Sequence, residues 1–121
     1  MARLVVPVVL AGGKYRVYPH FARAPAFAMI DVSPDGTYTM ELVENPVAGG
    51  GEGGGRGRYV KNLILSKRPD VLIATSVGPG VYYDFLESGV KIMKPTKKDI
   101  EGVIEDFLAG RLKPLEGPVE H

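Results

Sequence analysis

The stretch that decides the fold is residues 70–93, which read DVLIATSVGPGVYYDFLESGVKIM. Its beginning, Asp70–Val77, is mostly apolar and suits a buried strand. Gly78-Pro79-Gly80 interrupts this strand, and proline fits the first turn of a helix that ends at Gly89. Val90–Met93 follows as a second short strand. This order predicts a right-handed crossover between two parallel strands, so the expected fold class is α/β.

A further helix is expected after this unit. Its apolar residues keep the spacing of one helix face: Ile100, Val103, Ile104, Phe107 and Leu108. Thr96 followed by Asp99 resembles a capping box at the start of the helix, and Gly110 is a suitable stop. Residues 113–121 are expected to form a loose tail, so the predicted domain covers residues 1–112.

The part of the chain before the crossover is predicted to add antiparallel strands and a helix. Arg3–Ala11 is an apolar, β-branched run typical of a central strand. A loop over residues 12–25 follows, and then Ala26–Val32 and Thr37–Val43 flank a turn sequence, which indicates a hairpin. The next helix has apolar positions at 60, 63 and 64 and ends at Arg68-Pro69. The expected order is β-β-β-α-β-α-β-α, a mixed sheet with helices on its faces.

Composition limits the function classes. The chain has 121 residues and no cysteine, which excludes disulfides and thiolate metal ligands. The longest apolar run is too short to cross a membrane and lacks the features of a signal peptide, so we expect a cytoplasmic protein. A net charge of +1 gives no reason to expect nucleic acid or a membrane surface as a partner. Absent glutamine, scarce asparagine and frequent loop proline suggest a thermophilic source.

A glycine-rich loop is expected over residues 45–57, because so many glycines do not sustain a helix or strand interior. One interpretation is a passive linker. The other is a loop whose backbone N–H groups close over an anion together with nearby arginines. The residues assigned to that second role are Gly49, Gly50, Gly51, Gly53, Gly54, Gly55, Arg56 and Arg58.

The loop over residues 12–25 contains His20 and Arg23. An imidazole ligates metals and a guanidinium binds oxyanions in a bidentate manner, so this pair suits a small anionic or metal-bearing ligand. The competing interpretation is a loop histidine bonded to the backbone. Gly78 and Gly80 open a helix N-terminus, which favours anions, although the same residues also serve as ordinary punctuation between strand and helix. No nucleophile triad is visible, since the only other histidine is His121, and we therefore expect no enzyme.

Five short segments, taken together, resemble the dinitrogenase iron-molybdenum cofactor biosynthesis family, which includes small NifX-like and NafY-like proteins. They are His20-Phe21-Ala22-Arg23-Ala24-Pro25, Glu44-Asn45-Pro46, the triple-glycine loop, Val77-Gly78-Pro79 and Ala109-Gly110-Arg111-Leu112. The resemblance covers roughly Leu4 to Leu112. It implies a ribonuclease-H-like fold and the binding or carrying of a metal-sulfur cluster without turnover.

The family's histidine-phenylalanine-glycine-arginine motif maps onto His20, Phe21, Ala22 and Arg23, with alanine in place of glycine. Many relatives carry an additional ligand in the glycine loop, where this chain has Glu52. A nuclease of the ribonuclease H type is excluded, because the first strand lacks the metal-binding carboxylates.

The leading hypothesis is a non-enzymatic carrier of an iron-molybdenum or related metal-sulfur cluster, with His20 as metal ligand. Arg23, Arg56 and Arg58 are expected to balance the charge, and a recipient protein is the expected partner. Two alternatives stay open: a binding module for a phosphate-bearing metabolite, and a protein-interaction adaptor with an empty pocket.

Overall fold

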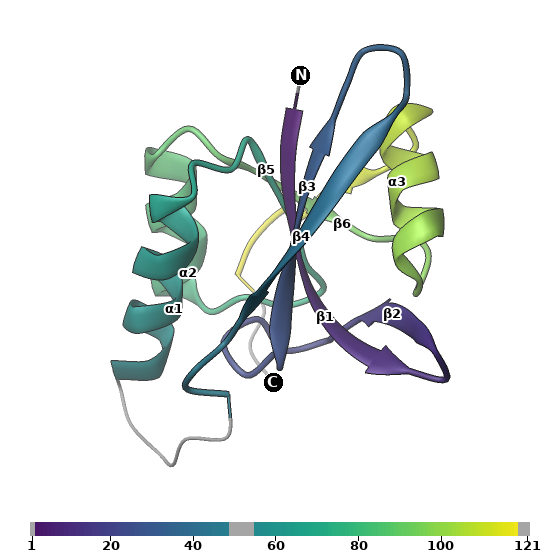
Figure 1. Cartoon of the computed structure of the whole chain (residues 1–121). Helices are drawn as coiled ribbons and strands as arrows, with labels where there is room; N and C mark the ends of the chain where they lie inside the picture. The colour runs from purple at the N-terminus through teal and green to yellow at the C-terminus, as the bar shows by residue number, and fades with distance from the viewer. Residues whose placement is uncertain (1, 49–54, 119–121) are drawn as a thin grey trace.

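The computed structural model describes residues 2–48 and 55–118, with only the backbone described at residues 55 and 56. Within these residues, strands form one mixed sheet that three helices cover (Figure 1). The strands are β1 Ala2–Ala11, β2 Lys14–Val17, β3 Ala26–Val32, β4 Tyr38–Glu44, β5 Val71–Ile73, β6 Lys91–Lys94 and β7 Lys113–Pro114. The helices are α1 Gly55–Ser66, α2 Pro79–Glu87 and α3 Ile100–Leu108. None of the helices in the described part is long and apolar enough to span a membrane.

The sheet has the order β4-β3-β1-β5-β6-β7, and β2 pairs with β1 outside this path. β3 runs antiparallel along one edge of β1, from Ala2 to Val8. The other edge is shared: β5 pairs in parallel with Leu4 and Val5, and β2 pairs antiparallel from Val8 to Ala11. β1 therefore changes partner on this edge just beyond the carboxyl end of β5.

Pro7 lies where β1 changes partner, which explains how a central strand tolerates a proline. Its carbonyl accepts a hydrogen bond from the Tyr18 backbone N–H at 2.8 Å, so its nitrogen faces the same edge. The missing donor thus falls between the β5 ladder and the β2 ladder and leaves neither with a gap.

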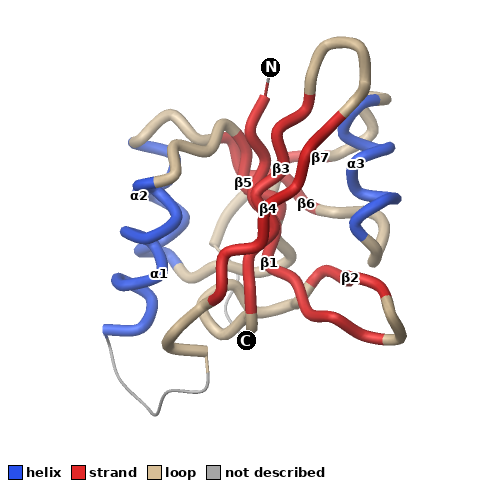
Figure 2. The backbone as a smooth tube through the Cα atoms, in the orientation of Figure 1, coloured by secondary structure: helices blue, strands red, loops and turns tan. Residues whose placement is uncertain are grey.

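The two faces of the sheet carry separate cores, because side chains alternate along each strand. Val5, Phe27 and Leu72 pack with α1 and α2 on one face. Leu4, Val6 and Val8 belong to the core on the other face, which α3 covers. Figures 1 and 2 show α1 and α2 together on one side of the sheet and α3 on the opposite side.

The expected strands Arg3–Ala11, Ala26–Val32 and Thr37–Val43 are confirmed to within a residue at each end. Three other expectations, which concern residues 12–77, need correction. The loop over residues 12–25 contains β2, whose register with β1 places Tyr15 opposite Leu10. The glycine-rich segment was expected to stay a loop through Gly57, yet α1 already begins at Gly55. The ladder expected over 70–77 ends at Ile73, and the chain then turns towards α2.

Two expectations at the C-terminal end were wrong. The N-cap of α3 is Asp99, whose carboxylate accepts from the Gly102 N–H, while the Thr96 hydroxyl donates to the buried Asp106. Residues 113–115 are not loose: β7 pairs with β6, and Leu115 is buried in the core. The Tyr82 hydroxyl also donates to the Leu115 carbonyl at 2.9 Å.

Candidate ligand-binding cleft

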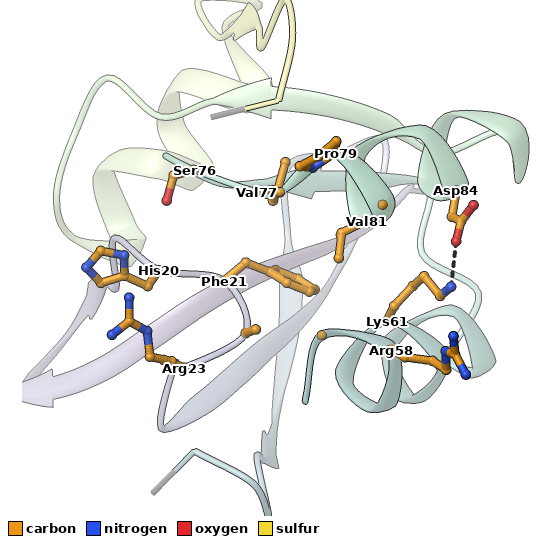
Figure 3. Close-up of a pocket in the computed structure, with 14 residues that line it drawn as sticks. His20, Phe21, Arg23, Arg58, Lys61, Ser76, Val77, Pro79, Val81 and Asp84 are labelled. Carbon is orange, nitrogen blue, oxygen red and sulfur yellow. Dashed lines mark hydrogen bonds and ion pairs between the residues drawn. The ribbon is translucent and has the colours of Figure 1, made fainter. Parts of the chain in front are cut away.

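A cleft of about 560 Å³ opens beyond the carboxyl end of β5, between the loop after β2 and the facing sides of α1 and α2 (Figure 3). Ligands in open α/β sheets bind at such places, because the loops that leave neighbouring strands diverge there. The residues that line the cleft are His20, Phe21, Ala22, Arg23, Gly57, Arg58, Lys61, Ser76, Val77, Gly78, Pro79, Gly80, Val81 and Asp84.

The first wall is the loop that carries His20 and Arg23, and its neighbours fix it to the core. The buried Phe21 packs on Phe27 and Phe85, with ring centroids 5.3 and 5.8 Å apart. The Ser76 hydroxyl donates to the carbonyl of Pro19 at 2.5 Å, which ties this loop to the segment after β5. His20 itself is half-buried.

Asn45 holds the same loop from the other side. Its Nδ2 donates to the carbonyls of Ala22 and Ala24, both at 2.9 Å, and its Oδ1 accepts from the Val47 N–H at 3.1 Å. The residue is only 6% exposed. A buried amide that satisfies three backbone groups specifies one loop conformation, since any other conformation leaves polar groups without partners.

The N-terminus of α2 forms the middle of the cleft. Gly78 caps the helix in an extended conformation, and Pro79 occupies its first turn. A Cβ at Gly80 would meet no atom within 4 Å, so the backbone is accessible there. The partial positive charge of a helix N-terminus favours an anion in this position.

The opposite wall consists of Arg58 and Lys61 on α1 and Asp84 on α2. Lys61 Nζ lies 2.5 Å from Asp84 Oδ2, and this ion pair joins the two helices. Figure 3 shows Arg58 and Lys61 on the far side of the cleft from His20 and Arg23. The cleft therefore has cationic side chains on both walls.

The structure brings five of the predicted site residues to one cleft: His20, Arg23, Arg58, Gly78 and Gly80. Arg23 and Arg58 lie on opposite walls and do not converge on one point (Figure 3). Gly55 and Arg56 belong to the first turn of α1. Outside the described residues lie Gly49, Gly50, Gly51, Gly53 and Gly54, as does Glu52.

Three residues that matter to the cleft were not predicted as site residues: Asn45, Lys61 and Asp84. Arg58 and Lys61 are three residues apart on a helix, and this spacing places both on one face. Lys61 could therefore have been predicted as a site residue from its spacing to Arg58. The position of Asp84 depends on how α2 packs against α1, which the sequence does not reveal.

The donor set of the cleft fits an anion that brings its own ligands. Among the described residues no group of three or more histidine, cysteine, aspartate or glutamate side chains could hold a metal ion. His20 offers an imidazole nitrogen, and the other polar side chains of the walls are mainly cationic donors. A metal-sulfur cluster whose terminal ligands are themselves sulfides satisfies this condition, because those sulfides fill the coordination of the metal and leave the cluster negatively charged.

The sheet and the cleft together define a class: small α/β proteins with a cationic cleft beyond the carboxyl end of a parallel strand. Within it, this chain belongs to the dinitrogenase iron-molybdenum cofactor family, which matches residues 3–110. The family is associated with iron-molybdenum cofactor biosynthesis, and the resemblance seen in the sequence is confirmed.

Known proteins resemble the chain along most of its length. An uncharacterized protein from Methanocaldococcus jannaschii is 28% identical over 101 residues, which are 84% of either chain. The apo form of the orange protein from Desulfovibrio gigas superposes with a TM-score of 0.81 at 24% identity, over 99% of this chain and 98% of that one. A putative NifB protein from Thermotoga has a TM-score of 0.75 at 30% identity, over 100% and 99% of the two chains.

Proposed function

We propose that this protein is a non-enzymatic carrier of a small anionic metal cluster, of the iron-molybdenum or a related metal-sulfur type. The observation that carries the proposal is the cleft, which joins one imidazole, cationic side chains on both walls and a helix N-terminus. Membership in a family associated with iron-molybdenum cofactor biosynthesis supports the same cargo.

In this proposal His20 contributes the one protein ligand to a metal ion, and Arg23 and Arg58 offset the negative charge of the cluster. The α2 N-terminus at Gly78 and Gly80 donates backbone N–H groups to the same ligand. The contributions expected of Arg56 and the glycine segment stay predictions from the sequence.

A carrier must release its cargo, and the shape of the cleft is consistent with release. Few protein atoms coordinate the cluster in this scheme, so a recipient protein that offers more ligands draws it away. The partner we propose is therefore a recipient protein that binds the cluster more completely.

We also propose the ribonuclease-H-like name for the fold, as the resemblance implies. Its support is the arrangement of three long strands, β1, β3 and β4, in antiparallel order, followed by β5 and β6 in parallel with β1.

The test uses tetrathiomolybdate, a coloured molybdenum dianion that carries its own sulfide ligands. The purified protein is incubated with it without oxygen and desalted, and the retained visible absorbance and molybdenum are measured. We expect the unmodified protein to retain both and His20→Ala to lose most of them. The melting temperature should move little, because His20 is only half-buried.

His20→Asn separates coordination from hydrogen bonding, since asparagine still forms hydrogen bonds but is a poor metal ligand. If His20→Asn retains the anion as well as the unmodified protein does, His20 is not a ligand. Phosphate compounds that raise the melting temperature, with no molybdenum retained, would favour the phosphate-binding alternative, which Arg23 and the α2 N-terminus also suit. Tight partner binding that survives His20→Ala would favour the adaptor.

A further inference from the structure

The ion pair between Lys61 and Asp84 lies inside the proposed binding cleft, since both residues line it. The side chain of Lys61 is 19% exposed and that of Asp84 is 42% exposed. The lysine is therefore the more enclosed partner, and the carboxylate is the one that water reaches.

Asp84 is the one carboxylate among the described residues that line this cleft. A carboxylate opposes the entry of an anion, so it is unexpected in a cleft that Arg58 and a helix N-terminus also line. It is not required to neutralise a buried charge either, because a lysine can extend its flexible stem to bring the ammonium group to water.

We propose that Lys61 is an anion-binding side chain and that Asp84 holds it when the cleft is empty. The inference rests on the proposed function and deepens it. An entering anion competes with the Asp84 carboxylate for the same ammonium group, and Lys61 turns from the carboxylate to the ligand. Asp84 then becomes fully hydrated, which its exposure allows.

This competition determines which anions bind and how tightly. An anion with a single charge gains little, because it offers Lys61 no stronger partner than the carboxylate that it displaces. An anion with two or more charges gains more. Asp84 therefore selects for multiply charged anions and keeps their binding weak enough for release.

The test is the dissociation constant of tetrathiomolybdate, measured by equilibrium dialysis for a set of variants of the full chain. Asp84→Asn frees Lys61, and we expect binding about fivefold tighter, within the range that a single charge contact contributes. Lys61→Gln is expected to weaken binding about threefold. Asp84→Glu keeps the negative charge and should tighten binding less than Asp84→Asn does.

The matched control is Asp31→Asn. Asp31 also forms an ion pair, with Arg3 at 2.8 Å, and its side chain is 33% exposed. Arg3 lies beside the start of β5, whereas the cleft lies beyond its carboxyl end. This variant changes the net charge as Asp84→Asn does but leaves the cleft intact, so its affinity should stay within about twofold of the unmodified protein.

The double variant Lys61→Gln with Asp84→Asn identifies the mechanism. If Asp84 acts by holding Lys61, the effect of Asp84→Asn falls below about twofold once Lys61 is gone. An effect that stays at fivefold without Lys61 overturns the inference, as does an Asp84→Asn variant no tighter than Asp31→Asn. If neither the unmodified protein nor Asp84→Asn binds tetrathiomolybdate, the proposed function is refuted, and this inference with it.

Discussion

Replacement of Asn45 by alanine tests whether the loop that carries His20 and Arg23 is held by one buried amide. The substitution removes both donors to the carbonyls of Ala22 and Ala24 and the acceptor for the Val47 N–H. A buried polar group left without its partner costs about 1–3 kcal/mol, and some of these groups will recover water. We therefore expect the free energy of unfolding to fall by about 2–4 kcal/mol, which lowers the melting temperature by roughly 10 °C.

The assay is urea unfolding followed by circular dichroism, together with anion retention at a temperature where the variant is folded. Asn62→Ala is the matched control, because Asn62 is the other asparagine of the chain and is exposed on α1. It should change stability by less than about 1 kcal/mol, and in the stabilising direction, because alanine favours helices more than asparagine does. If Asn45→Ala is as stable as Asn62→Ala, or if Asn45→Asp is equally stable although it cannot donate, the reasoning about this amide is refuted.

Three other predictions concern charge, pH and the end of the chain. Arg23→Gln should weaken tetrathiomolybdate binding about tenfold by loss of a charge-assisted contact; an effect below twofold, or one that vanishes in moderate salt, would mean that Arg23 makes no specific contact with the anion. The Thr96 hydroxyl and the Arg111 guanidinium hold the pKa of Asp106 below its usual value. The stability that the Asp106 carboxylate adds is therefore complete above about pH 4 and is lost as the pH falls through its lowered pKa. The urea midpoints of the unmodified protein and of Asp106→Asn should therefore approach each other as the pH is lowered. A chain that ends after Glu116 should unfold like the full chain, whereas one that ends at residue 112 loses β7 and the buried Leu115 and should be about 2–3 kcal/mol less stable; equal stability would show that the tail is dispensable.

The long periodic elements could be predicted from the sequence, because each carries its own burial pattern. β1 has ten residues with a continuous buried run, and α3 has nine residues with one apolar face. β2 and β7 could not, because they have four and two residues and are defined by the strand that each one meets. The start of α1 at Gly55 also departs from local preference, since glycine disfavours helices.

The candidate site divides in the same way. His20, Arg23 and Gly78 follow strands, and a loop at the carboxyl end of a strand is a place where function can be expected from sequence. Lys61 and Asp84 read as polar positions on two separate helices, and only the packing of α1 against α2 brings them together. Asn45 was visible as part of a family motif, but its role depends on partners more than twenty residues earlier in the chain.

The two separate cores have a consequence for how such a protein can evolve. Phe21, Val77 and Phe85, which support the cleft, all belong to the core beneath α1 and α2. Val103 and Ile104 of α3 pack on the other face and contribute nothing to the cleft walls. Substitutions beneath α3 can thus change the stability of the protein without altering the residues that line the cleft. Substitutions of Phe21, Val77 or Phe85 affect the shape of the cleft and the stability of the core together.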